Sequence, residues 1–139
     1  MGTWDVGAFD NDSAADWSGD LDDAPKAQRE SIIRRTLSDA VDEPDYLDGD
    51  LGSEAVAAAA VVAALLPDSP PVSSGYGPGF LAAGESLELP DDLVALANQA
   101  LDRVAAENSE LRELWAEGDE LRAWLATIAV IRAQLNGDA

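Results

Sequence analysis

The sequence contains no cysteine and no histidine, and Lys26 is its single lysine. Without cysteine the chain forms no disulfide and no thiolate zinc site. Without histidine a Ser-His-Asp triad is impossible, and only Lys26 could act as the amine base for a serine nucleophile. An enzyme of this composition would therefore have to use a pair of carboxylates or a carboxylate metal site.

Positive charge is also scarce, because 8 basic residues stand against 28 acidic ones and the net charge is -20. A surface this negative repels nucleic acid and anionic lipid headgroups, so we expect neither nucleic acid nor a membrane as a partner. We expect a basic protein instead, and no cofactor. The first residues, from Met1 to Val6, show neither the basic nor the apolar region of a signal peptide, which favours a cytoplasmic protein.

A hydrophobic content of 47% over 139 residues is typical of a folded chain with one core. We therefore predict a single helical domain over residues 1–139. Four of the seven prolines and four glycines lie between Pro67 and Gly84. These residues predict a long loop over residues 67–89.

The longest continuous apolar segment, Ala55 to Leu66, reads AVAAAAVVAALL. Its twelve residues are too few for a bilayer span, which needs about 20. A helix that is apolar on all sides belongs in the middle of a protein core. We predict that this alanine-rich helix begins beside Glu54, ends at Pro67 and is surrounded by the other helices.

Five further segments have the 3.6-residue periodicity of amphipathic helices, and no segment shows a strand pattern. Aspartate or asparagine within residues 10–13 can cap the first, and Pro25 and Pro90 suit the first position of the second and fourth. The acidic segment from Asp42 to Gly52 is predicted to be a turn-rich connector. The fold class is therefore all-α, a compact bundle of about six helices around the alanine-rich one. The predicted amphipathic helices start within residues 10–13, at Pro25, at Pro90, at Ser109 and after a cap at Asp119, and they end near residues 23, 41, 104, 117 and 135.

The first helix carries a row of aspartates, Asp12, Asp16, Asp20 and Asp23, opposite its apolar residues Ala14, Trp17 and Leu21. Carboxylates one turn apart can bind a divalent cation or supply the acid and base of a hydrolase. The alternative is a solvated surface. Calcium-loop spacing is absent, since Ala14, Ala15 and Leu21 occupy three of its required positions. The acidic connector from Asp42 to Asp50 allows the same two interpretations.

Arg132 is unusual because it falls in the apolar stripe of the last helix, near Leu125 and Ile128. A buried arginine needs a carboxylate or other hydrogen-bond partner. Alternatively, its long side chain extends outward near the helix C-terminus, where a cation is favoured. The sequence leaves both arrangements open.

The chain opens with Met1-Gly2-Thr3-Trp4, followed by Phe9-Asp10-Asn11-Asp12 and Ala14-Ala15-Asp16-Trp17. Later come Tyr46-Leu47, Val61-Val62-Ala63-Ala64-Leu65 and Ser109-Glu110-Leu111-Arg112-Glu113-Leu114-Trp115. In this order the segments resemble the bacterial family known as domain of unknown function 4259. Two residues differ from the family pattern: Asp5 stands where glycine is expected, and Ala60 stands where an acidic residue is expected. The resemblance implies a cytoplasmic bacterial protein with this order of helices, and it implies no activity.

Two hypotheses follow for the function. The first is a non-enzymatic protein interaction module whose acidic face, Asp12, Asp16, Asp20 and Asp23, binds a basic partner. The second is a metal-dependent hydrolase that uses the carboxylates of Asp12, Asp16 and Asp20. The sequence leaves the oligomeric state open.

Overall fold

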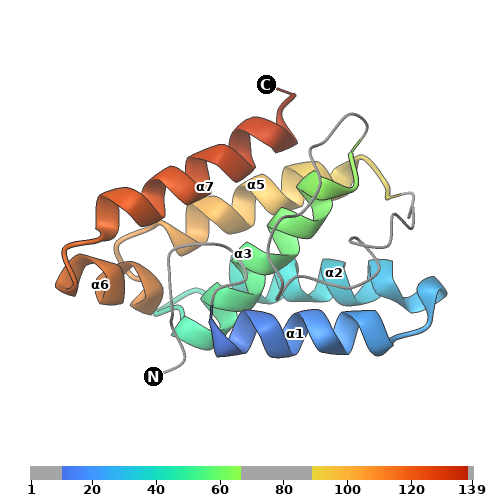
Figure 1. Cartoon of the computed structure of the whole chain (residues 1–139), viewed down its shortest axis with the longest axis horizontal. Helices are drawn as coiled ribbons and strands as arrows, with labels where there is room; N and C mark the ends of the chain where they lie inside the picture. Colours follow the sequence, from blue (N-terminus) through green and yellow to red (C-terminus); the bar gives the residue numbers. More distant parts are fainter. Residues whose placement is uncertain (1–10, 67–88, 138–139) are drawn as a thin grey trace.

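The computed structural model describes residues 11–66 and 89–137, and these residues form six helices (Figure 1). The described part contains no strand, only an isolated bridge between Leu47 and Ser109. None of its helices is long and apolar enough to cross a membrane. The all-α prediction is confirmed. The helices are α1 (Asp12–Asp23), α2 (Lys26–Val41), α3 (Gly49–Ala64), α5 (Asp92–Val104), α6 (Glu110–Glu117) and α7 (Leu121–Leu135).

Some sequence predictions concern residues outside the described ranges. They are the loop over residues 67–89, of which only Leu89 is described, and the segment that contains Trp4 and Phe9. These stay predictions, as does the single domain over residues 1–139.

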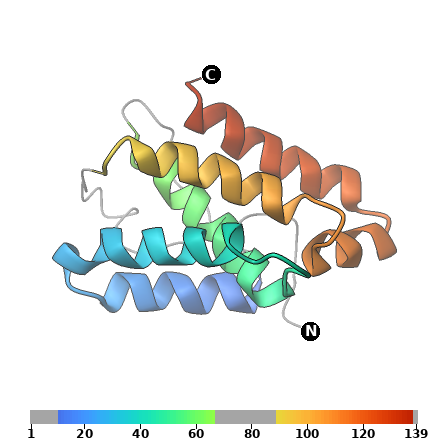
Figure 2. The ribbon, with the colours of Figure 1, turned by 180° about the vertical axis from the view of Figure 1, so that it is seen from behind.

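The alanine-rich helix α3 is central, as its composition predicts. It contacts all five other helices, and it crosses obliquely between α1 and α2 on one side and α5 and α7 on the other (Figures 1 and 2). Ala57, Ala58 and Ala59 are fully buried, and so are Val61 and Val62. Because alanine side chains are short, helices on several sides can approach α3 closely.

Helix α1 begins after Asn11, whose side-chain oxygen accepts a hydrogen bond from the backbone N–H of Ala14 at 2.8 Å. Its predicted inward residues are buried. The indole N–H of Trp17 donates to Thr36 Oγ1 at 2.8 Å, which joins α1 to α2. The guanidinium of Arg29 donates to the carbonyl of Leu21 at 3.2 Å, so a side chain of α2 covers the C-terminal end of α1.

The start of α3 differs from the prediction by six residues, because the helix begins at Gly49 and not at Ala55. Asp48 is its N-cap, and the Asp48 carboxylate accepts from the backbone N–H groups of Asp50 and Leu51. Gly52, which suggested a turn, is buried inside the helix. The predicted connector is therefore shorter and ends at Asp48.

Three other helix starts also differ slightly from the sequence prediction. Pro25 and Pro90 precede α2 and α5, which begin at Lys26 and Asp92. Asp119 does not cap α7, because its φ of 59° places it in the left-handed region and Glu120 occupies the cap position. The left-handed residue reverses the chain between α6 and α7.

Candidate functional site

Helix α1 presents the most acidic surface among the described helices, with five aspartates and no basic residue. The four predicted site residues, Asp12, Asp16, Asp20 and Asp23, are all exposed. Within residues 11–66 and 89–137, none of these four carboxylates accepts a side-chain hydrogen bond or forms an ion pair. Their charges are therefore open to solvent and to any approaching molecule. We call these four residues the acidic face.

The structure does not bring the predicted hydrolase residues together. In the described ranges, no group of three or more acidic side chains is arranged to hold a metal ion. The acidic connector instead has structural roles: Asp48 caps α3, and Asp50 accepts a hydrogen bond from Ser13 Oγ at 2.7 Å. That bond ties the first turn of α1 to the first turn of α3.

Glu54 extends the negative surface beyond α1. It was not predicted as part of a site, because in the sequence it only flanks the alanine-rich segment. Burial raises the pKa of the Glu54 carboxyl above its ordinary value, and the negative charges of Asp50, Asp20, Asp39 and Asp48 raise it further. These four acids come from α1, α2 and the start of α3. The negative field near the acidic face is therefore assembled from several helices.

Basic side chains balance little of this charge, because five of the eight are used inside the fold. Arg34 binds Asp92 at 2.6 Å, and this exposed pair lowers the pKa of the Asp92 carboxyl. Arg103 donates to the carbonyls of Glu43 and Asp45 at 3.1 and 3.0 Å, which fixes the connector that precedes α3. The five internally bonded cations are Arg29, Arg34, Arg103, Arg112 and Arg132.

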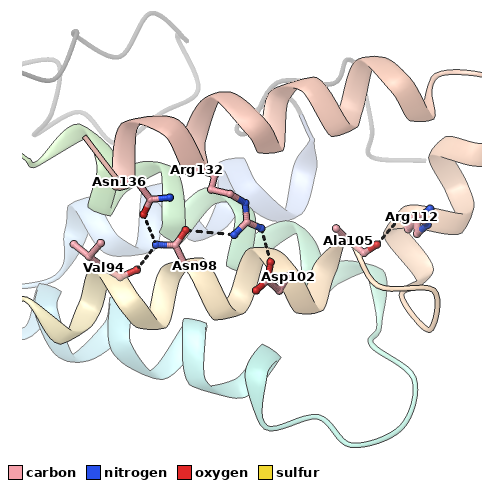
Figure 3. A network of polar contacts seen from close by, with 7 residues as sticks. All are labelled: Val94, Asn98, Asp102, Ala105, Arg112, Arg132 and Asn136. Carbon is pink, nitrogen blue, oxygen red and sulfur yellow. Dashed lines mark hydrogen bonds and ion pairs between the residues drawn. The ribbon is translucent and has the colours of Figure 1, made fainter. Parts of the chain in front are cut away.

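Arg132 combines the two arrangements that the sequence left open. Its side chain is 34% exposed, and its guanidinium extends from α7 to Asp102 Oδ1 on α5 at 2.6 Å. It also donates to Asn98 Oδ1 at 3.4 Å, and the Asn98 amide donates to Asn136 Oδ1 at 3.0 Å (Figure 3). Arg132 is thus half-buried and paired, and this network holds the C-terminal half of α7 against α5.

An open hollow of about 410 Å³ lies beside this network. Leu125, Ile128 and Ala129 of α7 contribute apolar surface, and Arg132 and Asn136 contribute polar groups. No sequence pattern predicted this hollow, because it forms where α7 meets the C-terminal end of α5 at Ala105.

These features define an acidic, all-α protein in which a row of carboxylates on one helix has no ion-pair partner among residues 11–66 and 89–137. The family model described as Domain of unknown function (DUF4259) matches residues 2–127, so the chain belongs to this family. The resemblance seen in the sequence is confirmed. No curated protein and no solved structure matches the chain.

Proposed function

We propose that this protein is a non-enzymatic interaction module of the bacterial cytoplasm, and that its acidic face binds a basic protein surface. The observation that carries the proposal is the state of Asp12, Asp16, Asp20 and Asp23, which are exposed and form no ion pair with any residue of the described part of the chain. Uncompensated charges at helical spacing repel one another by about 0.2–0.5 kcal/mol for each pair. A basic partner would relieve that repulsion.

The neighbouring helices support the same assignment. Burial is the main cause that raises the pKa of the Glu54 carboxyl, and acids from α1, α2 and α3 raise it further, so the negative potential extends over more than a single helix. Four of the five internally bonded arginines, Arg34, Arg103, Arg112 and Arg132, are bonded to carbonyls or carboxylates away from α1. Only Arg29 is bonded to α1, at the carbonyls of its C-terminal end. A field of this kind steers an oppositely charged protein and accelerates its association at low salt.

A capture experiment with matched variants tests the proposal. The test variant replaces Asp12, Asp16, Asp20 and Asp23 by asparagine. The control variant replaces the exposed acids Asp91, Glu107, Glu117 and Asp119 by their amides and removes the same total charge. We expect the wild type and the control to retain a basic protein from bacterial lysate at low salt. We expect the test variant to lose it, and all three to lose it at high salt, since salt screens exposed charges. Equal retention by both variants would contradict the proposal.

Calorimetric titration with Ca²⁺, Mg²⁺ and Mn²⁺ separates this function from a metal-dependent hydrolase. Diffuse attraction to the acidic face behaves like added salt and does not saturate at a fixed stoichiometry. A saturable heat that disappears when Asp12, Asp16 and Asp20 become asparagine would favour the hydrolase and exclude the proposed module.

A further inference from the structure

Helix α7 differs from every other described helix because it contains no acidic residue. Its sequence, LRAWLATIAVIRAQL, carries two arginines and a net charge of +2 in a chain of net charge -20. It packs on α3, α5 and α6 with one face only. Both views of the ribbon show α7 at an outer edge of the molecule (Figures 1 and 2).

The outward face of α7 is apolar. Val130 is 58% exposed, Ala123 and Ala126 are exposed, and Ala133 is half-buried. Their spacing of three, four and three residues keeps them in one row along the helix. The hollow lined by Leu125, Ile128 and Ala129 borders this row. An apolar row beside a hollow is the kind of surface that another helix covers.

We propose that a second copy of this chain covers this face, with the two α7 helices packed antiparallel about a two-fold axis near Ile128. A two-fold interface must be self-complementary. Reversal of α7 about Ile128 exchanges Ala123 with Ala133 and Ala126 with Val130, so the row faces an equivalent row in register. Small side chains at these positions let the two helices approach closely.

Charge also favours a second copy on this face. Two chains of net charge -20 repel each other wherever acids meet, and α7 is the acid-free helix of the described part. In the antiparallel pair, Arg122 of each copy lies beside Gln134 of the other. There the last carbonyls of α7 carry partial negative charge.

In this dimer the side chain of Arg122 from the second copy would lie in the hollow beside α7. A two-fold axis keeps equivalent sides of the two helices together, and Arg122 shares a side of α7 with Ala129 and the hollow. The apolar floor suits the stem of an arginine. Asp102, held beside the hollow by Arg132 and 70% exposed, offers a carboxylate to its guanidinium.

The contact is one helix wide, which places it among small interfaces of less than about 1,200 Å². The association is therefore weak. It strengthens with salt, because salt screens the repulsion between the two acidic chains. This dependence is opposite to that of a basic partner on the acidic face, so either proposal can fail while the other stands.

Sedimentation analysis over a range of protein concentrations tests the inference. In about 500 mM salt we expect the mass to rise with concentration from 14.5 kDa to twice that value, and to rise less in about 50 mM salt. Ala126→Glu places a charge in the row, and we expect this variant to stay monomeric. Ala95→Glu, at an exposed position of α5, adds the same charge elsewhere and should dimerise like the wild type.

A wild-type protein that stays monomeric under all these conditions would overturn the proposal. Equal dimerisation of Ala126→Glu and Ala95→Glu would overturn it as well. Circular dichroism on both variants shows whether they remain folded, and Arg122→Ala, which leaves the apolar row intact, should weaken the dimer at least severalfold.

Engineered cysteines test the direction of packing, since the chain has none of its own. We expect Ala123→Cys mixed with Ala133→Cys to form a disulfide-linked dimer. Ala123→Cys alone should not, because in the antiparallel pair its two copies lie about 15 Å apart along the axis. A disulfide requires Cα atoms within about 7 Å. Efficient cross-linking of Ala123→Cys alone would contradict antiparallel packing.

Discussion

Glu110 Oε1 accepts a hydrogen bond from the backbone N–H of Gly49 at 2.7 Å, so a carboxylate of α6 lies at the N-terminal end of α3. Two backbone hydrogen bonds of 2.9 Å join the same segments, from Leu47 N–H to the Asn108 carbonyl and from Glu110 N–H to the Leu47 carbonyl. Negative charge at the start of a helix complements its dipole. This contact therefore stabilises the start of the central helix, together with the Asp48 cap.

Removal of the Glu110 carboxylate should therefore destabilise the fold. We expect Glu110→Ala to lower the free energy of unfolding by about 1–2 kcal/mol, since a charged acceptor and a helix-end charge are both lost. Glu110→Gln should cost about half as much, because its amide oxygen can still accept from Gly49. Urea unfolding followed by tryptophan fluorescence measures both values. Glu107→Ala, an exposed acid of the preceding connector, is the control and should change stability by less than about 0.5 kcal/mol.

The two glycines at the start of α3 should respond differently to alanine. A Cβ at Gly52 would meet Leu111 Cβ at 3.5 Å, an ordinary contact, whereas a Cβ at Gly49 would meet Glu110 Oε1 at 3.1 Å. We expect Gly52→Ala to stabilise the protein by about 0.5–1 kcal/mol through helix propensity. Gly49→Ala should stabilise the protein less than Gly52→Ala does, or should destabilise it, because the Glu110 side chain must move away from the new Cβ. Thermal and urea unfolding of the two variants checks the order, and a larger gain for Gly49→Ala would contradict it.

Glu54 should make stability depend on pH. Its carboxyl pKa lies above the ordinary 4.5, chiefly because of burial and also because of nearby acids, so the folded state binds the proton more tightly than the unfolded state. The stability that protonated Glu54 contributes is present below pH 4.5 and is lost as the pH rises through the raised pKa. We expect Glu54→Gln to stabilise the protein at pH 7 by a few tenths of a kcal/mol, with a smaller gain at pH 4.

Urea unfolding at both pH values measures this effect. Glu107→Gln corrects for the general loss of one negative charge, since Glu107 is exposed. The account of Glu54 is wrong if Glu107→Gln stabilises the protein as much as Glu54→Gln at pH 7, or if the gain from Glu54→Gln does not shrink at pH 4.

The hydroxyl of Tyr46 should ionise at an unusually high pH. Its hydroxyl donates to Glu113 Oε1 at 2.5 Å. This hydrogen bond is the main cause that raises the pKa of Tyr46 to about 12. Ultraviolet absorbance during an alkaline titration should show this step, and it should be missing in Tyr46→Phe. Glu113→Gln should move the step down toward pH 10, because the charged acceptor is gone.

The raised pKa of Tyr46 also makes the stability of the fold depend on pH in the alkaline range. Because the folded state favours the protonated phenol, the contribution of Tyr46 is present below pH 10 and is lost between pH 10 and about 12. Circular dichroism over this range should show that Glu113→Gln loses less stability than the wild type as the pH rises through it.

The sequence predicted the helices whose signals are local. The buried residues Ala14, Trp17 and Leu21 followed from periodicity alone, and Ser109 and Gly118 bound α6 where the pattern placed them. The start of α3 was predicted wrongly because Asp48-Gly49 is also a common turn sequence. The helical start is stabilised by the Asp48 cap and also by Glu110, which lies 61 residues beyond Gly49 in the chain and accepts its backbone N–H.

The predicted acidic face is a surface property, so its exposure followed from helical spacing. The sequence could not predict whether these carboxylates contact other charged groups, because that depends on which helices pack beside one another. Glu54 illustrates the point, since its pKa is raised by burial and by Asp50 of its own helix, and also by Asp20 and Asp39 on other helices. The pairing of Arg132 with Asp102 likewise depends on the packing of two helices, α7 on α5.

The sequence by itself determined the class of this protein. Its periodic apolar residues specify helices, its alanine-rich segment specifies the central one, and its excess of acids specifies a negative surface. Each of these depends on residues close together in the chain. Only the tertiary structure decided where α3 begins, which cations are neutralised and where the hollow beside α7 forms, because each of these depends on side chains from helices far apart in sequence.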